Sequence, residues 1–258
     1  MNIAVVTGAA QGLGLATATL LAKNGYEVVL TDVQPLEEVV ARLLATQVKV
    51  LGLCGDVSSE DFVRQLAARV HADYGGADVL VNNAGISMIA PAEETSVAQW
   101  QRVMDVNLLG PFLMCKYLGP QMLARRRGSI INVASVAGLG GVSHRSAYNT
   151  SKHGLIGLTR TLAAEWGGRG VRVNAVCPGW IKTEMDDAAQ EMGLYSDHDI
   201  INRVPMARFA QAADVAGAIA YLADWEKSGF VNGVSLPVDG GWMADASWES
   251  LRLSTRLP

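Results

Sequence analysis

Short apolar segments alternate with longer segments of helical periodicity along most of the chain. The apolar segments are rich in Val, Ile and Leu, end in turn-forming residues, and span 3–8, 27–32, 49–56, 77–85, 128–135, 171–179 and 233–241. Apolar residues recur at helical spacing in 11–24, 60–74, 97–126, 148–166 and 212–224. Strands that are apolar on both faces and alternate with helices pair in parallel. The pattern predicts an α/β fold, a doubly wound parallel sheet of about seven strands with helices on both faces and ligands at the carboxyl ends of its strands.

Composition and charge argue against some classes of partner but do not identify the function. With 258 residues, half of them apolar, the chain suits one large core, so we expect a single Rossmann-type domain over 1–258. The net charge is -4 and the basic residues are scattered apart from a run at 125–127, which argues against nucleic acid as a partner. No secretory leader or bilayer-spanning apolar run is evident, so we expect a cytoplasmic protein without a membrane partner.

The cysteines suggest packing rather than chemistry. Cys54, Cys115 and Cys177 are odd in number, widely spaced and embedded in apolar segments. This usage is typical of reduced thiols and argues against disulfides or a metal site.

A glycine-rich turn joins the first strand to the first helix. Gly8, Gly12 and Gly14 allow a sharp turn and a close approach of the backbone to a pyrophosphate, which free amides and the positive helix end would bind. The glycines could instead serve only tight helix–strand packing. Asp32, at the end of the second strand, could accept hydrogen bonds from both ribose hydroxyls of adenosine, or could simply form a turn. Because its charge opposes a 2'-phosphate and neither Val33 nor Gln34 is a cation, NAD is favoured over NADP.

Tyr148 and Lys152 lie one helical turn apart at the start of a long amphipathic segment. Oxidising a secondary alcohol requires a base on the hydroxyl group. Lowering the pKa of a tyrosine from about 10 toward 7 takes on the order of 4 kcal/mol, which a neighbouring ammonium can supply. Ser135, at a strand end, could steady the substrate oxygen. Each residue has an ordinary alternative, because such pairs occur on solvated helix faces and serine often ends a strand.

Motifs spread over nearly the whole chain resemble the single-domain branch of the short-chain dehydrogenase/reductase family. They are "TGAAQGLG" at 7–14, "GDV" at 55–57, "NNAG" at 82–85, Asn107 in "MDVNLLG", "INVAS" at 131–135, "YNTSK" at 148–152 and "PGWIKT" at 178–183. Each motif alone is a modest signal, whereas their number, order and spacing are highly specific together.

The resemblance implies a cofactor site and a catalytic tetrad. The dinucleotide would be held by Thr7, Gly8, Gln11, Gly12, Leu13, Gly14, Asp32, Val33, Asp56, Val57, Asn83, Ala84, Gly85, Pro178, Gly179, Ile181 and Thr183, with Asp56 and Val57 at the adenine and the last four at the nicotinamide. The tetrad would be Asn107, Ser135, Tyr148 and Lys152. By this likeness Tyr148 and Lys152 also contact the cofactor, with Lys152 holding the ribose hydroxyls, and Asn107 anchors a water that links the lysine to solvent.

Substrate residues carry less signal. We expect them after "NNAG", in the 136–145 loop and in a polar lid over 183–210, with Ser87, Val142, Arg145, Trp180 and Met185 as candidates. Arg145 could attract an anionic or polyhydroxylated substrate, or could form a surface or interface ion pair. His144 is interpreted as a surface or pocket-lining residue.

The tail over 243–258 would expose leucines and a tryptophan unless it docked on another surface. We therefore expect it at an interface, where it could contact an adjacent active site. The family usually forms tetramers, which predicts a homotetramer. The expected function is NAD-dependent hydride transfer between nicotinamide and a secondary alcohol or ketone, with a sugar, polyol or related hydroxy compound favoured. The alternatives are a reductase of acyl-chain or cyclic ketones, and a non-catalytic dinucleotide sensor, whose mark would be a missing tyrosine or lysine.

Overall fold

A parallel sheet of seven strands forms the centre of the molecule in the computed structural model, which describes residues 2–182 and 196–254. Their spatial order is β3-β2-β1-β4-β5-β6-β7, and every neighbouring pair is parallel. The strands are β1 (Ile3–Thr7), β2 (Glu27–Asp32), β3 (Val50–Cys54), β4 (Val79–Asn82), β5 (Gly128–Val133), β6 (Val171–Pro178) and β7 (Ser235–Val238). The predicted doubly wound sheet is confirmed.

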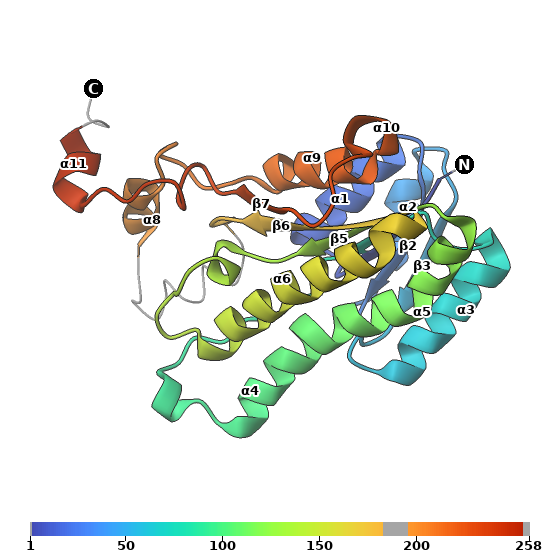
Figure 1. The fold of residues 1–258 in the computed structure, drawn as a ribbon, viewed down its shortest axis with the longest axis horizontal. Coiled ribbons are helices and arrows are strands. Elements are labelled where there is room, and N and C mark those ends of the chain that lie inside the picture. Colours follow the sequence, from blue (N-terminus) through green and yellow to red (C-terminus); the bar gives the residue numbers. More distant parts are fainter. Residues whose placement is uncertain (1, 183–195, 255–258) are drawn as a thin grey trace.

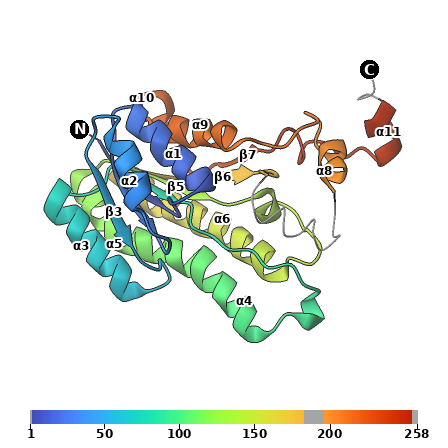
Figure 2. The same ribbon diagram turned by 180° about the vertical axis from the view of Figure 1, so that it is seen from behind.

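Helices cover both faces of the sheet (Figures 1 and 2). One face carries α1 (Gly12–Lys23), α2 (Glu37–Leu44), α9 (Ala212–Ala223) and α10 (Trp225–Ser228). The other carries α3 (Glu60–Tyr74), α4 (Val97–Met104), α5 (Gly110–Arg125) and α6 (Ser146–Trp166). Alternate residues of each strand enter opposite cores: Val6 packs with the α1 side and Val5 with the α3 side. This double burial explains why the strands read as continuous apolar runs.

Some elements differ from the prediction. The segment 97–126 is helical as its periodicity predicts, but a π-helical turn at Asp105–Leu109 interrupts the α-helical geometry between α4 and α5. The short helices α2, α8 (Asp197–Arg203), α10 and α11 (Glu249–Ser254) were not predicted. These helices span only four to eight residues, which is too short for helical periodicity to stand out along the sequence. The start of α8 is fixed by a capping box between Ser196 and Asp199.

The cysteine prediction was wrong at one position. Cys115 and Cys177 are buried, and burial raises the pKa of their thiols to about 12 and about 11. Cys54 is exposed, because it ends β3, the edge strand of the sheet. Within the described ranges, none of the helices combines the length and the apolar character needed to cross a bilayer.

Candidate active site

Two adjoining cavities lie at the carboxyl ends of the strands, where a parallel sheet is expected to bind ligands. A groove of about 350 Å³ runs beside the ends of β1, β2 and β3, and a pocket of about 250 Å³ lies beside β5, β6 and the start of α6. They share Asn83, Gly85 and Ile86, so together they form one continuous cleft.

The glycine turn passes too close to other backbone for larger residues. Gly8 has a φ of 64°, and a Cβ built on it would lie 2.8 Å from Cα of Ala84. A Cβ on Gly14 would lie 1.9 Å from the carbonyl oxygen of Gly8. The first amides of α1 have no partner within the helix, so they are suited to an anionic group at this turn.

Thr7 and Asn83 brace this turn from behind. The Asn83 side-chain amide donates to the carbonyls of Thr7 and Gly8 at 2.9 and 3.0 Å. The Thr7 hydroxyl oxygen accepts from the amides of Asn83 and Ala84 at 3.0 and 2.9 Å. Both residues were predicted as cofactor contacts, and in this geometry their side chains shape the turn itself.

Asp32 lies in the groove, as predicted. Its carboxylate accepts from the amides of Ala10 at 2.9 Å and Gln34 at 3.0 Å, so it is tied to the glycine turn. Val33, beside it, is 65% exposed. The described groove residues that were predicted are Gly8, Gln11, Asp32, Val33, Asp56, Val57, Asn83, Ala84 and Gly85. A glycine turn with an acidic residue at the next strand end fits a dinucleotide.

Arg102 is a groove residue that the sequence analysis missed. Its guanidinium donates to Asp56 and to the Ser58 hydroxyl, both at 2.8 Å. Partial burial would raise the pKa of the Asp56 carboxyl, but the bonds from Ser58 and Arg102 outweigh it and lower this pKa. No local motif marks Arg102, because α4 brings it to Asp56 from 46 positions away.

Tyr148 and Lys152 face the pocket from the first turns of α6. The Lys152 ammonium lies 5.6 Å from the centre of the Tyr148 ring and donates to the carbonyl of Val133 at 2.8 Å. Lys152 is only 4% exposed, and this burial lowers its pKa to about 8. The pair is therefore part of a desolvated cleft and not of a solvated helix face.

Ser135 and Asn107 complete the predicted tetrad in different ways. Ser135 lines the pocket, and its hydroxyl oxygen accepts from the amide of Ala137 at 3.1 Å, which caps the turn at Val136–Gly138. Asn107 is fully buried in the π-helical turn behind the pocket. A Cβ built on Gly85 would lie 3.3 Å from Oδ1 of Asn107 and 3.5 Å from Nζ of Lys152, so both polar atoms lie beside the same glycine.

The Asn107 side chain links two parts of the site. Its Oδ1 accepts from the amide of Ile86 at 2.8 Å, while Nδ2 donates to the carbonyl of Ile86 at 2.9 Å and to the Ser151 hydroxyl at 3.1 Å. Ser151 in turn donates to the carbonyl of Tyr148 at 2.7 Å. The π-helical turn thus positions an amide that fixes the segment after β4 against α6. Such turns are frequent at functional sites.

The substrate side is formed by predicted and unpredicted residues. Of the predicted ones, Ser87, Val142, Arg145 and Trp180 line the pocket, together with Leu13, Pro178, Gly179 and Ile181 from the cofactor set. Thr183, Met185 and the first part of the lid lie outside the described residues. Ile86, directly after "NNAG", and Val136 and Ala137, in the 136–145 loop, line the pocket in segments where substrate residues were expected. Val133 and Ala134 also line it and were not predicted to, because apolar lining residues resemble core residues in sequence.

The segment from Trp242 into the tail supports one wall of the pocket. The rings of Trp180 and Trp242 stack with centres 4.4 Å apart, and the Arg203 guanidinium of α8 lies 4.6 Å from the Trp242 ring. Arg203 also forms an ion pair with Asp245 at 3.6 Å. Trp248 is 70% exposed, and His144 is exposed and absent from the pocket lining.

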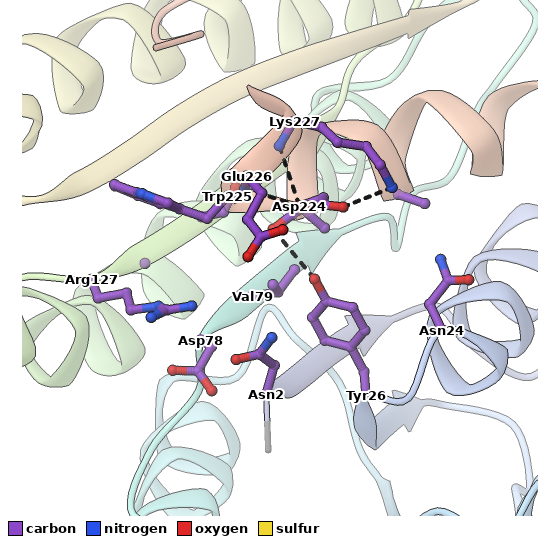
Figure 3. A pocket seen from close by; sticks show the side chains of 14 residues that line it. Asn2, Asn24, Tyr26, Asp78, Val79, Arg127, Asp224, Trp225, Glu226 and Lys227 are labelled. Atoms are coloured by element: carbon purple, nitrogen blue, oxygen red, sulfur yellow. Dashed lines mark hydrogen bonds and ion pairs between the residues drawn. The ribbon is translucent and has the colours of Figure 1, made fainter. Parts of the chain in front are cut away.

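A separate cavity of about 400 Å³ lies at the opposite, amino end of the strands, between Tyr26, Asp78, Arg127 and α10 (Figure 3). Two of its carboxylates are already engaged: Asp224 pairs with Lys227 at 2.8 Å, and Asp78 with Arg125 at 3.4 Å. It contains none of the tetrad. The cleft at the carboxyl ends is therefore the candidate active site.

Comparisons with known proteins identify the family of the chain. Residues 8–243 match the family model described as enoyl-(acyl carrier protein) reductase. The chain is 38% identical to D-threitol dehydrogenase of Mycolicibacterium smegmatis, covering 93% of this chain and 92% of that protein. It is 42% identical to cis-4-hydroxycyclohexanecarboxylate dehydrogenase of Sinomonas cyclohexanicum, covering 94% and 97%.

A solved structure is similar over almost the same length. It is assigned as an NAD(P) dependent gluconate 5-dehydrogenase from Beutenbergia cavernae and has NADP bound at low occupancy. The TM-score is 0.87 at 36% identity, covering 95% of this chain and 97% of that one. With the sheet, the glycine turn and the Tyr148–Lys152 pair in place, these matches show that the chain belongs to the short-chain dehydrogenase/reductase family, whose members bind a nicotinamide dinucleotide.

Proposed function

We propose that this protein is an NAD-dependent oxidoreductase that transfers a hydride between nicotinamide and a secondary alcohol or ketone. The observation that carries the proposal is the placement of Tyr148 beside the buried Lys152 ammonium, in a pocket continuous with the groove that contains Asp32. The dinucleotide would be held by the glycine turn, Asp32 and the Pro178–Ile181 segment, and when bound it would supply the hydride acceptor or donor.

Tyr148 is the proposed acid/base. In the oxidising direction the phenolate takes the hydroxyl proton of the alcohol while the carbinol carbon gives up two electrons as hydride, leaving a ketone. The Lys152 ammonium stabilises the phenolate, because the two groups share a cleft from which water is largely excluded. Ser135 donates a hydrogen bond to the substrate oxygen, and Asn107 holds the backbone of Ile86 beside Lys152. We also propose that a water bound at Asn107 links Lys152 to solvent.

NAD preference is proposed from Asp32, and an Asp32→Asn variant tests it. The change keeps a side-chain acceptor for the glycine turn and removes the charge that would repel a 2'-phosphate. We expect kcat/KM with NAD to fall about 10-fold and the NADP-to-NAD ratio to rise about 10–100-fold, as expected from about 1–3 kcal/mol per charged hydrogen bond. Steady-state kinetics with both cofactors measure this. Asp61→Asn, on exposed α3, is the control, and a wild-type preference for NADP would contradict the proposal.

The proposed substrate is a sugar, polyol or related hydroxy compound, supported by the D-threitol named for one relative; a hydroxy-substituted ring, named for another, is the alternative. The matched family description names an acyl carrier protein reductase, which supports an acyl-chain substrate as a second candidate. NAD reduction against sugars, polyols, hydroxy acids and cyclic alcohols, beside ketone reduction with acyl thioesters, separates these candidates. Failure of every secondary alcohol and ketone to turn over would leave a dinucleotide sensor.

A homotetramer in the cytoplasm is proposed as the working form. Large apolar side chains are exposed on α5, on the α9–α10 side and on the tail: Phe112, Tyr221, Trp225, Phe230, Trp248 and Leu251. Burying such surfaces between copies removes them from water, and the tail would lie at an interface. Light scattering is expected to give four times the monomer mass of 27.4 kDa. A fully active monomer would contradict the arrangement.

A further inference from the structure

Arg145 places a fixed positive charge in the substrate pocket. It precedes the first turn of α6, three residues before Tyr148, and its half-buried side chain lines the same cavity. Its Nη1 donates to the hydroxyl of Ser87 at 2.9 Å, from the segment that follows β4. The guanidinium therefore belongs to the pocket wall and does not extend into open solvent.

The backbone around Arg145 is held on both sides. Ala90 and Arg145 form a parallel bridge, in which the amide of Ala90 donates to the carbonyl of His144 at 2.9 Å. His144 has a φ of 59°, an uncommon conformation for a residue with a side chain, and it turns the chain into α6. The Asn149 side chain, on α6, donates to the carbonyl of Val142 at 3.1 Å and so ties the loop before Arg145 to the helix. The position of the guanidinium is thus set before any ligand binds.

No carboxylate balances this charge in the part of the chain that the structure describes. The described residues that line the pocket include two charged side chains, Arg145 and Lys152, and both are basic. Arg145 takes part in none of the ion pairs between described residues. Lys152 is engaged by the Val133 carbonyl beside Tyr148, whereas Arg145 has a neutral partner that uses one of its five donors.

We propose that Arg145 binds an anionic group of the substrate, a carboxylate, so that the preferred substrate is a hydroxy acid and its oxidised keto acid. This inference rests on the proposed function, since it assumes that the carbinol lies at Tyr148. A guanidinium stays charged and matches a carboxylate with two parallel hydrogen bonds. The same pocket also has an apolar lining from Ile86, Val136 and Val142. Among the hydroxy compounds of the proposed function, a neutral one would leave this charge unbalanced, so those that carry a carboxylate are favoured.

Two probes that share a cyclohexane ring and differ in charge test the role of the Arg145 charge directly. The NADH-loaded protein is titrated calorimetrically with cyclohexanecarboxylate and with cyclohexanecarboxamide, which has nearly the same shape and no charge. We expect the carboxylate to bind at least about 10-fold more tightly, in line with a charge-assisted pair. Arg145→Met is expected to remove this difference, and Arg145→Lys to retain part of it, because an ammonium keeps the charge without the planar pair of donors.

Three controls make the result specific. Arg42→Met removes one exposed arginine on α2, outside the pocket, and is expected to leave both affinities unchanged. Ser87→Ala keeps the charge and removes the bond that orients it, so we expect a smaller loss for the carboxylate than in Arg145→Met. NADH affinity, measured by fluorescence, shows whether Arg145→Met is folded. Should it not fold, a carboxylate preference reduced in both Arg145→Lys and Ser87→Ala supports the anion site, and a preference unchanged in both overturns it.

The outcomes separate this inference from the proposed function. Equal affinity for acid and amide, or a difference that survives Arg145→Met, overturns the anion site even if NADH binds and neutral alcohols are oxidised. Tighter binding of cyclohexanesulfonate or inorganic phosphate than of the carboxylate overturns the carboxylate assignment. Absence of NADH binding or of any turnover overturns the proposed function instead. Higher kcat/KM for hydroxy acids than for their amides, lost in Arg145→Met, supports both.

Discussion

A Tyr148→Phe variant is expected to lose about 10²–10⁴-fold in kcat while it still binds NADH. The change removes the phenolic oxygen that takes the substrate proton and leaves the ring in the pocket lining beside Lys152. Because the glycine turn and Asp32 are untouched, the cofactor affinity should stay within about 3-fold of wild type, which is the size of an ordinary surface change. Initial rates of NADH formation and fluorescence titration with NADH measure the two quantities.

Tyr117→Phe is the matched control for this experiment. The Tyr117 hydroxyl donates to Glu60 at 2.7 Å on the exposed side of α5, away from the cleft. Its loss should leave kcat unchanged. A Tyr148→Phe enzyme with near-normal turnover would show that another group carries the proton, and the acid/base role of Tyr148 would have to be abandoned.

Lys152→Met is expected to separate activity from stability. Turnover should fall by at least about 10²-fold, because the phenolate loses the ammonium that favours it. At pH 7 the folded protein should nevertheless become more stable. Lowering the lysine pKa from 10.5 to about 8 by burial corresponds to about 3 kcal/mol of unfavourable free energy in the native state. Leaving the Val133 carbonyl without its donor offsets about 1 kcal/mol of the gain.

The pH dependence of this gain gives a distinct signature. Between pH 8 and about 10.5 the unfolded chain binds a proton at Lys152 that the folded protein does not, so the wild type gains stability as the pH rises through this window. Below pH 8 both states are protonated and the cost is constant. The advantage of Lys152→Met should therefore be largest below pH 8 and shrink toward pH 10.5. Denaturant unfolding of both proteins from pH 6 to 10.5 measures it; a constant difference, or a less stable variant at pH 7, would contradict the burial cost.

The fold and the central site were predictable because their signals are local. Each strand is buried on both faces and therefore reads as a short apolar run, and Tyr148 and Lys152 are four apart on one helix. Asp32 and Ser135 both line the cleft because residues at the carboxyl ends of parallel strands meet at one edge of the sheet, and their roles stay predictions.

Features that depend on contacts between distant segments could not be predicted in the same way. Arg102 joins the groove only because α4 returns to the loop after β3, and no spacing in the sequence marks its bond to Asp56. The π-helical turn at 105–109 lies within a continuous helical pattern, so the sequence does not mark it. Only the structure shows the turn and the hydrogen bond from the amide of Ile86 to Asn107. Cys54 was assigned to the core because its segment is apolar, yet edge strands leave their ends exposed.

The stacked indoles of Trp180 and Trp242 have a practical consequence for handling the protein. An affinity tag fused after the tail would attach to the segment that supports the pocket through this pair and through Arg203. A tag placed before Ile3 would attach at the amino end of β1, at the opposite end of the strands from the cleft. Kinetic constants for purified material are therefore best taken from amino-terminally tagged or tag-cleaved preparations.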